Sequence, residues 1–110
     1  MNIANLQKSL QEFAKDRDWE QYHNPKNLAM ALTVEAGELQ EIFQWLSPKE
    51  AEQIKFNSEH AAEEIADVFL YLVRIADVLD IDIEQAVEMK LKKNSNKYPA
   101  EGSNTPRSMR

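Results

Sequence analysis

Cysteine is absent from this chain of 110 residues, and glycine occurs only twice. Without cysteine the chain can form neither disulfide bonds nor thiolate metal sites, so a bound metal would need oxygen or nitrogen ligands. Glycine and proline together are too few for a fold rich in tight turns, whereas runs rich in Ala, Leu, Glu, Gln and Lys favour helix. These features predict an all-α protein.

Long hydrophobic runs are also missing. No run approaches the roughly 18 residues of a membrane span, and the first residues do not resemble a signal peptide, so we expect a cytoplasmic protein. The net charge of −6 and the pI of about 4.9 argue against a general nucleic-acid binder. An acidic protein can still bind a phosphorylated ligand if metal cations lie between the two negative partners.

The length is that of one domain, which we place at residues 1–99. The polar remainder, residues 100–110, contains a glycine and a proline and is expected to be a flexible tail. A hydrophobic content of 43% is enough for a core, but a small one. Because chains with small cores often complete their apolar burial by association, we expect an oligomer.

Apolar residues at helical spacing predict four main helices. These cover approximately residues 2–17, 25–46, 58–79 and 82–97, with a short additional helix over residues 49–55. Asn24, followed by Pro25, is expected to cap the second helix, and Asp82, with Gln85 three residues later, the last one. Residues 18–25 have no helical period and are predicted to form a loop that carries two aromatic side chains and a histidine.

The second helix carries acidic residues on its apolar face. Apolar side chains alternate at spacings of four and three from Leu28 to Leu46, and Glu35 lies in the middle of this stripe. Glu38 lies one turn further along. Burying an ionised carboxylate without a partner costs several kcal/mol, so Glu35 must be paired, protonated or bound to a metal.

The third helix supplies a matching acidic pair. Two apolar rows, from Ala61 to Leu79 and from Ala62 to Ala76, are expected to face inward and to make contacts on two sides, and Glu64 and Asp67 border them. Four carboxylates would then converge from two helices. Hard cations such as magnesium prefer oxygen ligands of this kind.

Two other interpretations apply to these acidic residues. Among 19 acidic residues, some E-x-x-E spacings arise by chance on a solvated surface, as for Glu38 and Glu41. A di-iron carboxylate bundle would need Glu-x-x-His pairs on two helices. The sequence has one such match, Glu20 with His23, and it lies in the predicted loop.

The spacing of the carboxylates resembles a known family. Glu35-Ala36-Gly37-Glu38, followed after 25 residues by Glu64-Ile65-Ala66-Asp67, is similar to the E-x-x-E…E-x-x-D signature of the all-α nucleoside triphosphate pyrophosphohydrolases, the MazG-like superfamily. Residues 17–28, residues 43–45 and the stretch from Lys90 to Pro99 look like its dCTP pyrophosphatase branch. The resemblance implies a four-helix protomer that assembles as a dimer or a dimer of dimers. It also implies hydrolysis of a nucleoside triphosphate, dCTP or a modified pyrimidine deoxynucleotide, to the monophosphate and pyrophosphate with magnesium.

The resemblance further implies roles for individual residues. The metal ligands would be Glu35, Glu38, Glu64 and Asp67. The base and sugar pocket would be lined by Trp19, His23, Trp45 and Tyr71. The phosphates would be approached, across a subunit boundary, by Lys90, Asn94, Lys97 and Tyr98. We assign the general base to Glu38, because Glu35 sits deeper in the apolar stripe and should be committed to metal.

Structural alternatives stay open for several of these residues. Lysines at the end of the last helix complement the helix dipole, and the tryptophans could belong to the core. His23 could bond to its own backbone, and Tyr71 could pair with Arg74. For the whole chain, the alternative function is a non-enzymatic helical module that binds magnesium or a nucleotide, and only turnover separates it from an enzyme.

Overall fold

The computed structural model describes residues 1–100, and every regular element in that range is helical. The chain divides after Asp80 into two compact units, Met1–Asp80 and Ile81–Arg110. The first contains α1 (Ile3–Asp16), α2 (Pro25–Phe43), α3 (Pro48–Gln53) and α4 (Glu59–Val78), with 3₁₀ turns at Glu20–Tyr22 and Ile54–Phe56. The second contains α5 (Ile83–Lys97). The all-α class is confirmed, and the described range contains five α-helices, of which α3 lies where the sequence predicted a short additional helix.

The domain boundaries predicted from the sequence are not settled by this division. One domain over residues 1–99 stays a prediction, and the predicted tail lies outside the described residues except for Ala100. Within the described residues, no helix combines the length and the apolar character that a membrane span requires.

Side-chain caps fix where α2 and α5 begin. The Asn24 side chain accepts a hydrogen bond from the Asn27 backbone N–H, and Pro25 follows in the first turn of α2. The Asp82 side chain caps α5 in the same way, by accepting from the Gln85 N–H. Each such cap stabilises a helix start by about 1 kcal/mol. Both caps were predicted from the sequence and are confirmed.

The helix ends were predicted less well. The sequence placed the end of α2 at Trp45 or Leu46, whereas the helix ends at Phe43. A turn then leads to Ser47, which forms a capping box with Glu50 at the start of α3. Because Ser47 caps α3 only four residues after Phe43, α2 ends before Trp45.

Two aspartates with left-handed backbone follow α1 and α4. Asp18 has φ 57° and Asp80 has φ 55°, a conformation that aspartate tolerates better than most side chains. After Asp18 the chain folds back, so that the Trp19 N–H donates to the Ala14 carbonyl over 2.8 Å. This bond holds the start of the loop, with Trp19 in it, against the end of α1.

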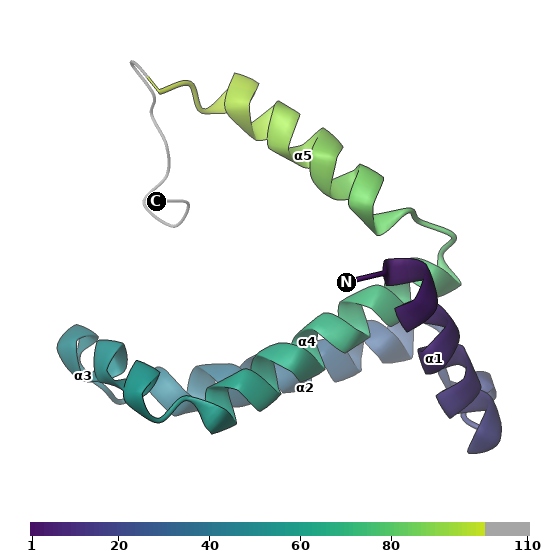
Figure 1. The fold of residues 1–110 in the computed structure, drawn as a ribbon, viewed down its shortest axis with the longest axis horizontal. Coiled ribbons are helices and arrows are strands. Elements are labelled where there is room, and N and C mark those ends of the chain that lie inside the picture. The colour runs from purple at the N-terminus through teal and green to yellow at the C-terminus, as the bar shows by residue number, and fades with distance from the viewer. Residues whose placement is uncertain (101–110) are drawn as a thin grey trace. The chain divides into compact units, whose positions relative to one another are not determined.

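Helices α2 and α4 lie side by side and run in opposite directions, while α1 packs against α4 near the C-terminal end of α4 (Figure 1). The residues that are most deeply buried are few and mostly small. They are Ala14, Leu28, Ala61, Val73 and Ala76. The core of this chain is therefore small, as the sequence suggested.

The face that α4 buries differs from the one expected. The row from Ala61 to Leu79 was predicted to face inward, but Ile65, Leu72 and Leu79 are 56%, 38% and 47% exposed. Glu64 and Arg74 are instead buried, at 8% and 9% exposure. The prediction was wrong for these three apolar positions. The buried side of α4 carries Glu64 and Arg74 beside small apolar residues of the predicted rows.

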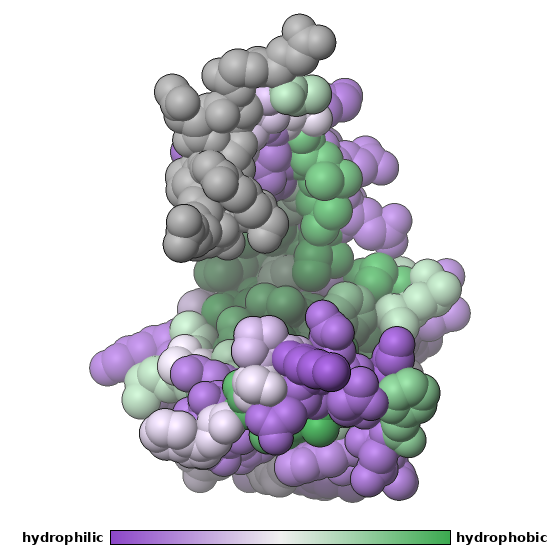
Figure 2. All heavy atoms as spheres, turned by 90° about the vertical axis from the view of Figure 1, so that its left-hand side faces the viewer, coloured by the Kyte–Doolittle hydropathy of each residue, from purple (hydrophilic) through white to green (hydrophobic). Residues whose placement is uncertain are grey.

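The second unit contributes a single described helix. Ile83, Val87 and Leu91 recur every four residues along α5, and hydrophobic side chains run along this helix in Figure 2. A lone amphipathic helix cannot bury such a face by itself. Within its own unit, α5 has no second described helix to pack against.

Candidate metal and nucleotide site

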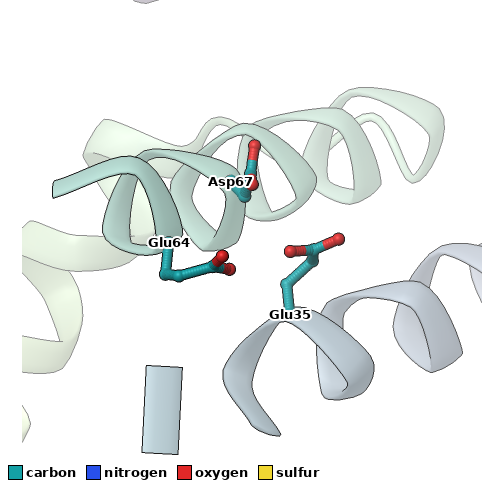
Figure 3. Close-up of side chains that lie close together, drawn as sticks. All are labelled: Glu35, Glu64 and Asp67. Atoms are coloured by element: carbon teal, nitrogen blue, oxygen red, sulfur yellow. The ribbon is translucent and has the colours of Figure 1, made fainter. Parts of the chain in front are cut away.

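Three carboxylates meet between α2 and α4. Glu35 extends from α2, Glu64 and Asp67 extend from α4, and each offers an oxygen within 4.8 Å of the others. Glu35 and Glu64 point their carboxyl groups toward one another, with Asp67 one turn along α4 (Figure 3). We call these three residues the carboxylate cluster. The antiparallel pairing of the two helices thus brings together three of the four residues proposed as metal ligands.

The cluster has strong internal repulsion. The pKa of Glu35 is raised from 4.5 to about 7, first by burial and then by hydrogen bonding to Glu38 and by the charges of Glu38, Asp67 and Glu64. Burial, followed by hydrogen bonding to Glu38 and the charge of Glu38, also raises the pKa of Glu64. Crowded carboxylates disfavour one another's ionised forms unless a cation lies among them.

The donor set fits a divalent cation. One oxygen of Glu35 and one of Glu64 (Oε2 in each) are buried without a hydrogen-bond partner. Such an acceptor normally finds a donor or a metal, because leaving it unpaired costs about 1–3 kcal/mol or more. The combination of unpaired acceptors, shared negative charge and oxygen donors suits a hard cation.

Glu38 lies at the edge of the cluster. It is exposed and is not among the three carboxylates that meet within 4.8 Å. Its carboxyl nevertheless contributes to the raised pKa of both Glu35 and Glu64. The fourth proposed ligand is therefore a neighbour of the cluster on its solvent side.

A cavity of about 480 Å³ opens beside the cluster, between α1, the loop after it and α4. Asp67 belongs to the carboxylate cluster and also lines the cavity. The other lining residues are Leu6, Ser9, Leu10, Phe13, Trp19, His23, Leu70, Tyr71 and Arg74. The volume lies in the usual range of small-molecule sites, and the wall is mostly apolar with a few polar groups. Of the proposed base-binding residues, Trp19, His23 and Tyr71 lie here.

Helix α1 supplies much of the wall of this cavity, a role that was not predicted from the sequence. Leu6, Leu10 and Phe13 have the apolar spacing that predicts a helix over residues 2–17. In the structure they line the cavity, where the Phe13 and Trp19 rings meet edge to face with centroids 5.6 Å apart. No motif marks these positions, because an apolar stripe looks the same whether it faces a core or a cavity.

His23 is held by a side chain from α4. The Nε–H of Arg74 donates to Nδ1 of His23 over 3.1 Å. Burial, and then the charge of Arg74, lower the pKa of His23. Burial, together with the charges of Glu35 and Asp67, raises the pKa of Tyr71. At neutral pH the cavity therefore presents a neutral imidazole and a neutral phenol.

Other proposed residues lie elsewhere. Trp45, beyond the end of α2, is 88% exposed and does not line the cavity. Lys90, Asn94 and Lys97 lie along α5, in the second unit, and Tyr98 follows directly after that helix. The Lys97 ammonium lies 5.3 Å from the centre of the Tyr98 ring. The roles proposed for these four residues and for Trp45 stay predictions.

The described residues thus define a helical protein with a candidate divalent-metal site beside an apolar cavity. A model of the MazG-like family matches residues 30–107, which include the three clustered carboxylates and Glu38. The chain belongs to the MazG-like family, as its E-x-x-E…E-x-x-D spacing predicted.

Similar proteins extend the comparison to most of the chain. It is 48% identical to dCTP pyrophosphatase 1 of Mus musculus over 91 residues, or 80% of this chain and 54% of that protein. It is 44% identical to the Homo sapiens dCTP pyrophosphatase 1 over 92 residues, with 81% and 54% covered. The chain therefore spans about half the length of these relatives. A pyrophosphatase from Archaeoglobus fulgidus, known from a crystal structure, is 44% identical with a TM-score of 0.81, over 87% of this chain and 91% of that one.

Proposed function

We propose that this protein hydrolyses a nucleoside triphosphate, dCTP or a modified pyrimidine deoxynucleotide, to the monophosphate and pyrophosphate, and so removes unwanted nucleotides from the pool. The observation that carries the proposal is a cluster of carboxylates beside a cavity of about 480 Å³, with Asp67 belonging to both. The names of the relatives, dCTP pyrophosphatase 1 and a pyrophosphatase, support it.

Glu35, Glu64 and Asp67, with Glu38 at their edge, would hold magnesium. When bound, the metal would neutralise the triphosphate, which an acidic protein repels, and lower the pKa of a water molecule. The unpaired oxygens of Glu35 and Glu64 support these two residues as ligands.

Glu38 is our candidate for the general base. A base must lie within reach of the attacking water and must not be fully occupied by other interactions. The exposed position of Glu38, beside more deeply buried carboxylates, supports this choice over Glu35.

The cavity would hold the base. Trp19 and Tyr71 offer aromatic surfaces, and stacking on such rings contributes about 1–3 kcal/mol for any base. Discrimination must therefore come from hydrogen bonds, and His23 is the proposed source. We further propose that Lys90, Asn94, Lys97 and Tyr98 of the second unit bind the phosphates. The lysine ammonium groups and the Asn94 amide suit phosphate oxygens.

We also propose that the active protein is a dimer, or a dimer of dimers, of four-helix protomers. The small core and the exposed apolar side chains of Ile65, Leu72 and Leu79 on α4 support association. Trp45 would join a nucleotide site only through such assembly. A nucleotide-pool substrate agrees with the cytoplasmic location expected from the sequence.

A panel of nucleoside triphosphates with magnesium tests the proposal, scoring pyrophosphate against orthophosphate. We expect pyrophosphate, with the highest catalytic efficiency for dCTP. Glu64→Gln and Asp67→Asn should abolish turnover, whereas Glu41→Gln, an exposed acid on α2 outside the cluster, should not. Binding of magnesium and dCTP without any turnover would instead indicate the non-enzymatic module. Equal efficiencies for all bases would indicate a pyrophosphohydrolase of broad specificity.

A further inference from the structure

Arg74 is the centre of a polar network that joins three segments of the first unit. Its Nε–H donates to Nδ1 of His23 in the loop over 3.1 Å, and its Nη1 donates to Oδ2 of Asp77 over 3.3 Å. The same Asp77 oxygen accepts from the Gln11 side chain of α1 over 2.7 Å. Arg74 is only 9% exposed. The guanidinium is therefore fixed on both sides, by an acid and by an imidazole.

The network determines which nitrogen of His23 carries the proton. A guanidinium is always protonated and can only donate, so Nδ1 of His23 must act as an acceptor. A neutral imidazole that accepts at Nδ1 carries its hydrogen on Nε2. Protonation at Nδ1 would break the bond to Arg74 and place a second positive charge beside it. The free edge of His23 is therefore a hydrogen-bond donor.

We propose that Arg74 is a positioning residue that fixes His23 as an Nε2–H donor, and that this donor selects cytosine over thymine and uracil. The inference rests on the proposed function for its substrate. Cytosine has an unprotonated ring nitrogen, N3, on its Watson–Crick edge, whereas thymine and uracil carry a hydrogen there. The Nε2–H of His23 can donate to N3 of cytosine, but it faces the N3–H donor of thymine or uracil. A site that leaves buried polar groups unpaired in this way rejects a substrate strongly.

The groups around His23 support a role at the cavity and not only in packing. His23 and Arg74 both line the cavity, together with Trp19, Tyr71 and Asp67. The Trp19 ring lies beside that of His23, with centroids 6.3 Å apart. An aromatic ring next to a fixed donor gives one surface for stacking and one group that distinguishes the edge of the base.

Nitrogen NMR of the histidine side chains tests the positioning without any substrate. The chain has two histidines, and the second, His60, has a side chain that is 70% exposed and lies 3.4 Å from Glu64. In the wild type we expect His23 as a single Nε2–H tautomer with a pKa below the ordinary histidine value of 6.5. In Arg74→Met, which keeps the length but removes the donor and charge, we expect a mixture of tautomers and a higher pKa.

The second measurement is the ratio of kcat/KM for dCTP to that for dTTP. We expect Arg74→Met to lower it about tenfold, the value of one hydrogen bond, with a smaller effect on dTTP hydrolysis itself. Arg74→Lys, which keeps a donor and a charge, should retain part of the preference for dCTP over dTTP.

Three results would overturn the inference. The first is a wild-type His23 that carries its proton on Nδ1 or has an ordinary histidine pKa of 6.5 or higher, a measurement that needs no variant to fold. The second is an unchanged His23 spectrum in Arg74→Met. The third is a changed spectrum with an unchanged ratio of dCTP to dTTP. Absence of all triphosphate hydrolysis in the wild type would refute the proposed function, while the spectra would still report on the positioning.

Discussion

Replacing Glu35 with Gln should stabilise the metal-free protein above neutral pH. The substitution keeps the size of the side chain and removes one negative charge from the carboxylate cluster. In the unfolded chain this carboxyl titrates near 4.5, and in the folded chain near 7. Between these values the folded state binds more protons than the unfolded state, so the wild type loses stability as the pH rises through this window.

The magnitude follows from the shift in pKa. Each pKa unit corresponds to about 1.4 kcal/mol, so a shift from 4.5 to about 7 corresponds to roughly 3.5 kcal/mol. Glu35 is half-buried, and screening by solvent reduces the effect to about 1–2 kcal/mol. For a domain of this size that amounts to roughly 4–12 °C in Tm.

The assay is thermal unfolding in a metal chelator from pH 5 to pH 8. The wild type should lose Tm across this range, and Glu35→Gln should lose much less. Glu41→Gln, an exposed acid on the same helix, is the matched control and should behave like the wild type. Added magnesium should raise the Tm of the wild type more at pH 8 than at pH 5.5, because protons compete with the metal.

Parallel curves for the wild type and Glu35→Gln would refute the reasoning, because they would mean that Glu35 does not titrate in this window. A magnesium effect that is equal at both pH values, or equal in the two proteins, would show that the cation binds somewhere other than the carboxylate cluster.

Three further predictions follow from the same structure. Magnesium binding near pH 6.5 should release protons, and binding at pH 8.5 should release far fewer, because the pKa of Glu35 is about 7. Calorimetry in buffers of different ionisation enthalpy measures this release, and a binding enthalpy that does not depend on the buffer would contradict it. Gly37→Ala should raise the Tm, because a Cβ there meets nothing within 4 Å and alanine stabilises a helix by about 1 kcal/mol relative to glycine. A lower Tm would mean that a partner or ligand occupies the space beside Gly37. Light scattering should detect an oligomer that Ile65→Glu weakens, since Ile65 is 56% exposed on α4; an active wild-type monomer would exclude it.

The features that could be predicted from the sequence are local ones. Caps such as Asn24 and Asp82 depend on residues three positions apart, and they form as expected. Glu35 stood out because a carboxylate in an apolar stripe needs a local explanation. Its position one turn before Glu38, and the similar pair on α4, were enough to predict the family.

The features that could not be predicted depend on how helices meet. The apolar row with Ile65 and Leu72 was expected to face inward, but the helix rotates to bury Glu64 and Arg74. Hydrophobicity alone cannot give this rotation, because it depends on partners such as His23, which lies 51 residues away in sequence from Arg74. The cavity was missed for the same reason, since α1 gives no local sign that it faces an open space.

The two tryptophans lie in very different surroundings, and this gives the protein two fluorescent reporters. Trp19 lines the cavity, between the Phe13 and His23 rings, whereas Trp45 is 88% exposed beyond α2. With Trp45→Phe, the remaining emission would come from Trp19 and would be quenched by a nucleobase stacked on it. With Trp19→Phe, the emission of Trp45 would shift to shorter wavelength when a second chain covers it. Ligand binding and assembly could then be followed separately and in real time, each in its own single-tryptophan variant.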